Sequence, residues 1–113
     1  MARDVRAIMR PQSVAVLGAS ATRITQGNHV IGNLQRAGFA GRIIPVHATA
    51  ATINDLPAVN AISALPPGVD VAVIAVPAGG VAAVLAELDQ AKVRSAVVFS
   101  NGFSAEQERQ FRR

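Results

Sequence analysis

Three short apolar runs that do not alternate with polar residues constrain the fold of this chain most strongly. They occupy Ser13–Leu17, Asp70–Val76 and Ser95–Phe99, and they are followed directly by a glycine, a proline and a Ser-Asn-Gly sequence. Strands that are buried on both faces have this pattern, which is typical of parallel sheets covered by helices. We therefore expect a parallel sheet with a helical layer on each face.

Helices are predicted between these runs. Apolar residues recur at helical spacing over Asn28–Ala37, and either Asn28 or Thr25 is a suitable N-cap. Gly38 can adopt the left-handed conformation that ends such a helix, with Phe39 packing back against it. A second helix is expected over about residues 79–92.

The order of the elements indicates the fold class. A fourth strand is expected at Arg42–Val46, and residues 48–69 form an irregular connection in which Ala58–Ala64 can make one set of helical turns. This order predicts an α/β fold, a Rossmann-like doubly wound parallel sheet of about four main strands with helices on both faces. We expect residues 1–12 to be a lead-in. Residues 13–113 are expected to form one domain that is truncated at its C-terminus, because the chain stops inside a helix opening at Ser104.

Composition excludes several classes of protein. The chain has 113 residues, 50% of them hydrophobic, which suits one small globular domain and argues against disorder. It has no cysteine, so disulfide scaffolds, Cys-ligated zinc and thiol catalysis are excluded. No apolar run is long enough for a transmembrane helix and no signal peptide is visible, so we expect a cytoplasmic protein without a membrane partner.

The net charge of +4 is a weak indication of nucleic-acid binding. Much of the basic excess lies near the two ends of the chain, and the sequence has neither Trp nor Tyr. A stacking platform for single strands is therefore not expected, and we predict no nucleic-acid partner. The two His residues and the scattered acids have no recognisable metal-ligand spacing, so no metal site is predicted.

A ligand site is expected at the carboxyl ends of the strands, where the strand order of such sheets reverses. Four loops should converge there, and the first, Gly18–Gly27, leads into a helix N-terminus, which favours phosphate. The second and third glycines of the dinucleotide fingerprint would fall at Ser20 and Arg23, and His47 stands near the position of the ribose-binding acid. Both departures disfavour NAD.

At this point the residues resemble a known family. The sequence Ser13-Val-Ala-Val-Leu-Gly-Ala-Ser20, then Gly27, then Gly38–Val46, is similar to the N-terminal CoA-binding domain of NDP-forming acyl-CoA synthetases, which are related to the α subunit of succinyl-CoA synthetase. The likeness continues in Leu65–Pro77 and in Ala96–Phe103. It covers about residues 10–105, with matching motifs in order at all four strand ends.

The resemblance implies a site for coenzyme A, and it assigns residues to three parts of that site. The CoA phosphates and ribose are expected at the first loop, on Gly18, Ala19, Ser20, Arg23, Gln26 and Gly27. The adenine and pantetheine region is expected to be walled by Pro45, Val46, Val76 and Pro77, with His47 as a further candidate contact. The thiol-bearing arm is expected along Ser100, Asn101 and Gly102.

The resemblance also implies a reaction for a larger protein. The complete enzymes make acyl-CoA from a carboxylic acid, CoA and ATP or another nucleoside triphosphate, through a phosphohistidine and an ATP-grasp domain. These ligase domains lie downstream of anything present here, so we predict no catalytic residue in this chain. Pro45-Val-His-Ala48 replaces the family's Pro-Val-Asn-Pro, and no lysine occurs between His47 and Asp55, which leaves Arg23 as the nearest base.

Simpler roles and other functions stay open at the level of sequence. Ser20 is interpreted as a hydroxyl donor to phosphate, Arg23 as a phosphate contact or a solvated base, and Asp70 as a turn residue at a strand start. One alternative function is an NAD(P)-binding Rossmann domain of an oxidoreductase or redox sensor, with His47 and Arg23 near a 2′-phosphate. Another is a non-catalytic scaffold with an empty crevice.

Overall fold

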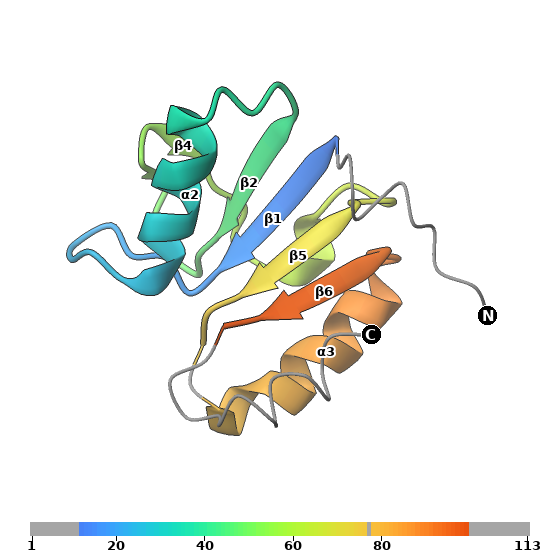
Figure 1. The fold of residues 1–113 in the computed structure, drawn as a ribbon. Helices are drawn as coiled ribbons and strands as arrows, with labels where there is room; N and C mark the ends of the chain where they lie inside the picture. The colour runs from blue at the N-terminus through green and yellow to red at the C-terminus, as the bar shows by residue number, and fades with distance from the viewer. Residues whose placement is uncertain (1–11, 77, 100–113) are drawn as a thin grey trace.

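Four parallel strands form the centre of the fold (Figure 1). The computed structural model describes residues 12–76 and 78–99. In this part of the chain the strands are β1 (Ser13–Leu17), β2 (Arg42–Val46), β3 (Thr52–Ile53), β4 (Leu56–Pro57), β5 (Val71–Ile74) and β6 (Ser95–Val98). The helices are α2 (Gln26–Arg36) and α3 (Val81–Gln90), with 3₁₀ turns η1 (Ile62–Ala64) and η2 (Ala78–Gly80).

The strand order β2–β1–β5–β6 confirms the predicted Rossmann-like topology. From β1 the chain moves to one side through α2 into β2, then crosses back to β5 and continues outward through α3 to β6. The direction therefore reverses between β1 and β5. Leu17, the last residue of β1, lies opposite Val46 of β2 and Ile74 of β5, so these three strands end at the same edge of the sheet.

Both faces of the sheet are buried, which explains why the strand sequences do not alternate. In β1, Val14 and Val16 pack on the face covered by α2, and Ala15 and Leu17 pack on the face covered by α3 and η1. All four side chains are at most 5% exposed. Figure 1 shows α2 beside β2 and α3 beside β6.

Helix α2 has well-defined signals at both ends. Thr25 is the N-cap, and it forms a capping box with Asn28, so Thr25 is the cap and Asn28 is the third helical residue. After the helix, Gly38 has a φ of 74°, and the N–H groups of Gly38 and Phe39 donate to carbonyls of the last turn at 3.1 and 3.0 Å. This pair of bonds is a Schellman motif, and it confirms the predicted helix end.

The connection between β2 and β5 differs from the sequence expectation. It contains the antiparallel β3–β4 hairpin, and only Ile62–Ala64 of the stretch 58–64 is helical, as a single 3₁₀ turn. Asn54 and Asp55 join the two strands with φ values of 52° and 65°. Two consecutive positive φ values define a type I′ turn, which Asn and Asp tolerate better than most residues do.

Two predictions about the ends of the chain lie outside the described residues. These are the lead-in of residues 1–12, apart from Gln12, and the helix expected to open at Ser104. Among the helices that the structure describes, none is long and apolar enough to cross a membrane.

Candidate functional site

The candidate site lies at the edge where the described strands β1, β2 and β5 end. The loop 18–25 follows β1, His47 begins the connection after β2, and Val76 follows β5. The parallel register thus brings three of the four predicted loops to one edge of the sheet. The fourth loop, with Ser100, Asn101 and Gly102, lies outside the described residues, as does Pro77.

Gly18 allows the first loop to cross directly above the neighbouring strand. Its φ is 101°, and a Cβ atom added there would lie 2.1 Å from the carbonyl oxygen of Ala75. The N–H of Ala75 donates to the carbonyl of Leu17 at 2.9 Å, so the two chains are held at this short separation. No residue with a side chain fits this position without a backbone shift.

Gly27 brings the start of α2 against the backbone of the same loop. A Cβ atom on Gly27 would lie 2.6 Å from the backbone nitrogen of Ala19. In the dinucleotide fingerprint the first glycine makes the tight turn and the third allows close packing of helix on strand. Gly18 and Gly27 take these two roles with a longer spacing, which the fingerprint test on the sequence did not detect.

Ser20 shapes the loop from within. Its Oγ accepts hydrogen bonds from the N–H groups of Thr22 at 3.1 Å and Arg23 at 3.3 Å. The hydroxyl also lies 3.2 Å from Thr22 Oγ1. The oxygen of Ser20 is therefore used to hold the turn, while its proton can still be donated to a neighbour or to a ligand.

Asn28 is the most highly connected polar side chain of the site, and sequence reasoning considered it only as a cap. It is 8% exposed. Its Oδ1 accepts from the backbone N–H groups of Ser20 at 2.8 Å and Thr25 at 3.1 Å. Its Nδ2 donates to the carbonyl of Ser20 at 2.9 Å and to Asn54 Oδ1 at 3.0 Å. The one signal in the sequence was the Thr25–Asn28 capping-box spacing.

An open cleft of about 500 Å³ lies between the loop and the β3–β4 turn. Its lining comes from both segments and includes Arg23, Asn28, Asn54 and Asp55. Arg23 and Asp55 are exposed. Within the described residues no hydrogen bond or ion pair is formed by the Arg23 guanidinium. This cation is therefore available to an anionic ligand.

His47 is used mainly to build its own loop. Its Nδ1 accepts from the backbone N–H groups of Thr49 at 3.1 Å and Ala50 at 2.9 Å, and its own N–H donates to Val59 at 2.9 Å. An Nδ1 atom that accepts carries no hydrogen, so in the neutral ring Nε2 is the donor. Only Nε2–H remains for the predicted ligand contact.

The other predicted site residues differ in accessibility. Gln26 is exposed at the first position of α2, and Val76 is half-buried. Ala19 is 5% exposed, and Pro45 is fully buried in β2. Pro45 therefore supports the wall of the site from behind, and its place in an edge strand agrees with the prediction that proline cannot belong to a central one.

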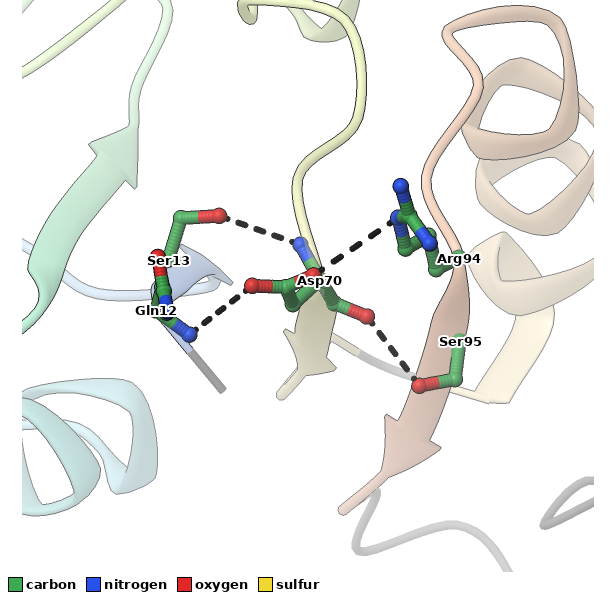
Figure 2. A network of polar contacts seen from close by, with 5 residues as sticks. All are labelled: Gln12, Ser13, Asp70, Arg94 and Ser95. Atoms are coloured by element: carbon green, nitrogen blue, oxygen red, sulfur yellow. Dashed lines mark hydrogen bonds and ion pairs between the residues drawn. The ribbon is translucent and has the colours of Figure 1, made fainter. Parts of the chain in front are cut away.

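Asp70 lies at the opposite edge of the sheet, where it joins strand starts (Figure 2). Its Oδ2 accepts from the N–H of Gln12 at 2.8 Å, its N–H donates to Ser13 Oγ at 3.1 Å, and its carbonyl accepts from Ser95 Oγ at 3.1 Å. Arg94 Nε lies 3.7 Å from Oδ1. This network confirms the role of Asp70 as a residue of the strand start.

The topology and the two close-contact glycines define a Rossmann-like domain with its ligand crevice at the topological switch point. The chain belongs to a family of CoA-binding domains: the family model described as "CoA binding domain" matches residues 12–113. This finding confirms the resemblance that the motifs indicated.

Similar proteins are ADP-forming ligases. The chain is 43% identical over 106 residues to acetate–CoA ligase [ADP-forming] II of Archaeoglobus fulgidus, covering 94% of this chain and 16% of that protein. It is 36% identical to the α subunit of acetate–CoA ligase [ADP-forming] I of Pyrococcus furiosus, covering 88% of this chain and 22% of the subunit. The chain thus spans less than a quarter of the length of these relatives.

Solved structures agree with this placement. The acetyl-coenzyme A synthetase 1 of Ca. Korarchaeum cryptofilum, in complex with phosphate and ADP, matches with a TM-score of 0.82 and 36% identity, over 88% of this chain and 22% of that one. A conserved hypothetical protein of Pyrococcus furiosus matches with a TM-score of 0.72 and 27% identity, over 88% of this chain and 84% of that one. The same fold therefore occurs within a large enzyme and in a chain of comparable size.

Proposed function

We propose that this chain holds CoA for an NDP-forming acyl-CoA synthetase, with the CoA phosphates on the loop after β1. The observation that carries the proposal is the close approach at Gly18 and Gly27, which opens the N-terminus of α2 to a ligand at the switch point of a CoA-binding domain. The first N–H groups of a helix have no partner inside the helix, and they carry partial positive charge.

The described residues suit different parts of CoA. The N–H groups of Gln26 and Gly27 suit the pyrophosphate, with the Ser20 hydroxyl as a further donor. Arg23 takes the place of the absent loop lysine as the cation for the 3′-phosphate. Val46, His47 and Val76 border the adenine and pantetheine region, and the resemblance adds Pro77, Ser100, Asn101 and Gly102.

In this proposal the chain binds and orients but does not catalyse. Holding the thiol in place lets it reach an acyl phosphate formed elsewhere in a complete synthetase, which lowers the entropic part of the barrier. ATP or another nucleoside triphosphate and the phosphohistidine belong to ligase and ATP-grasp domains outside this chain. A cytoplasmic location is part of the same proposal.

Calorimetric titration of the 113-residue chain tests the proposal. The ligands are CoA, dephospho-CoA, NAD, NADP and ATP. We expect saturable binding of CoA, and weaker binding of dephospho-CoA because the Arg23 guanidinium loses the 3′-phosphate. Binding of NADP but not of CoA contradicts the proposal and favours an oxidoreductase domain. A chain that is folded by circular dichroism but binds none of the five ligands contradicts it as well.

A further inference from the structure

We propose that Asn28 and Asn54 form a clasp that sets the shape of the loop 18–25 before ligand arrives, so that both are positioning residues for CoA affinity. This inference rests on the proposed function, because it assigns the loop to the CoA phosphates. Neither side chain needs to touch CoA. Their role is to hold the loop backbone against α2 in one conformation.

The carboxamide of Asn28 fits its surroundings in only one orientation. Two backbone N–H donors, from Ser20 and Thr25, meet Oδ1, and two acceptors, Ser20 O and Asn54 Oδ1, meet Nδ2. Thr25 Oγ1 also lies 2.8 Å from Oδ1 and 2.7 Å from the carbonyl of Gly18. One buried side chain thus joins both ends of the loop and the loop's third residue.

Asn54 connects this hub to a second part of the chain. Its Oδ1 accepts from Asn28 Nδ2, and its own Nδ2 donates to the Asn28 carbonyl at 3.4 Å. Gln35, two helical turns further along α2, donates to the carbonyl of Asn54 at 3.2 Å. The β3–β4 turn is therefore fastened to α2 at two points, and this turn forms the far side of the cleft beside the loop.

The clasp determines which N–H groups face the ligand. Those of Ser20 and Thr25 are directed to Asn28, and those of Thr22 and Arg23 to the Ser20 hydroxyl, which leaves Gln26 and Gly27 at the helix start. A loop that is already ordered loses less conformational entropy when it binds. Removing the clasp therefore lowers CoA affinity even though no ligand contact is deleted.

Three variants of the full chain test the inference: Asn28→Ala, Asn54→Gly and the double variant. Asn54→Gly preserves the fold, because glycine readily adopts the φ of 52° at this position. We expect CoA affinity to fall about tenfold in Asn28→Ala and about threefold in Asn54→Gly, from the cost of ordering the loop on binding. The double variant should bind no more weakly than Asn28→Ala, because both substitutions break one unit.

Amide hydrogen exchange provides a readout that does not depend on CoA. In both single variants, exchange at Ser20 and Thr25 should accelerate, while exchange at Val16 in the centre of β1 should not. Asn33→Ala is the matched control, since Asn33 is an exposed asparagine on the same helix, and it should leave affinity and exchange unchanged.

The two possible failures are distinguishable. If the unaltered chain binds CoA and Asn54→Gly binds it equally well with unchanged exchange at Ser20 and Thr25, the clasp is refuted and the proposed function stands. If the unaltered chain does not bind CoA, the proposed function fails. The exchange rates of Ser20 and Thr25 then decide the clasp alone, and no acceleration in Asn54→Gly refutes it.

Discussion

The two edges of the sheet use similar residues for different purposes. At the amino-terminal edge, Asp70 and two serines bind one another and the backbone at the starts of β1, β5 and β6 (Figure 2). At the carboxyl-terminal edge, Asn28 and Ser20 are also satisfied within the protein. Arg23, however, stands exposed at the cleft. Polar residues at a strand end are thus not evidence of a ligand site by themselves.

The difference between the edges has a physical origin. At the amino-terminal edge, short-range bonds between neighbouring strand starts use the available donors and acceptors. At the other edge, glycine contacts bring two backbones together and expose the N-terminus of α2. A ligand site is therefore marked by groups that the protein leaves available, next to backbone that only glycine can form.

The largest expected effect follows from removing the close contact at Gly18. We expect Gly18→Ala to lower the free energy of unfolding by roughly 3 kcal/mol or more, because the new Cβ meets the Ala75 carbonyl and the backbone has a positive φ. Urea unfolding measures this change. Gly68→Ala is the control: its φ is 82° but no atom lies within 4 Å, so only about 1 kcal/mol is expected. Equal losses in the two variants would show that the contact with Ala75 does not matter.

A smaller effect is expected at the amino-terminal edge. Asp70→Ala removes an acceptor from the N–H of Gln12, and we expect a loss of about 1–2 kcal/mol in the free energy of unfolding. CoA affinity should stay within about twofold, because the site lies at the opposite edge. Asp89→Ala, at an exposed acid on α3, should change stability by less than about 0.5 kcal/mol. A large loss of CoA affinity in Asp70→Ala would mean that the two edges are coupled.

Much of the fold could be predicted because its signals are local. Unbroken apolar runs showed the strands, and the Gly38-Phe39 pair showed the end of α2. The β3–β4 hairpin could not be predicted in the same way, because each strand has two residues and shows no periodicity. Its turn is held by Asn28 and Gln35, which are far from it in the sequence.

The candidate site could be located but not fully assembled. The Gly18–Gly27 loop was predicted as the phosphate loop from its position, and the resemblance supplied its residues. The part played by Asn28 depends on a contact across 26 positions, which no local pattern indicates. His47 was a candidate contact by position alone, whereas its Nδ1 is used by its own loop.

Arg23 gives the smallest effect on stability and the sharpest test of the contrast between the edges. Its guanidinium is exposed, so Arg23→Ala should change the free energy of unfolding by less than about 0.5 kcal/mol. CoA affinity should fall about tenfold, the loss typical of a charge-assisted bond to phosphate. The affinity for dephospho-CoA should change less.

The matched control for Arg23 is Arg42→Ala. Arg42 is an exposed arginine at the start of β2, on the amino-terminal edge, so this variant removes the same charge from the other side of the sheet. Titrations at two salt concentrations separate a local contact from a general field, because salt screens distant exposed charges. If Arg42→Ala weakens CoA binding as much as Arg23→Ala does, the net charge of the chain and not the position of Arg23 determines the affinity. A selective loss in Arg23→Ala assigns the 3′-phosphate to the cleft beside the loop.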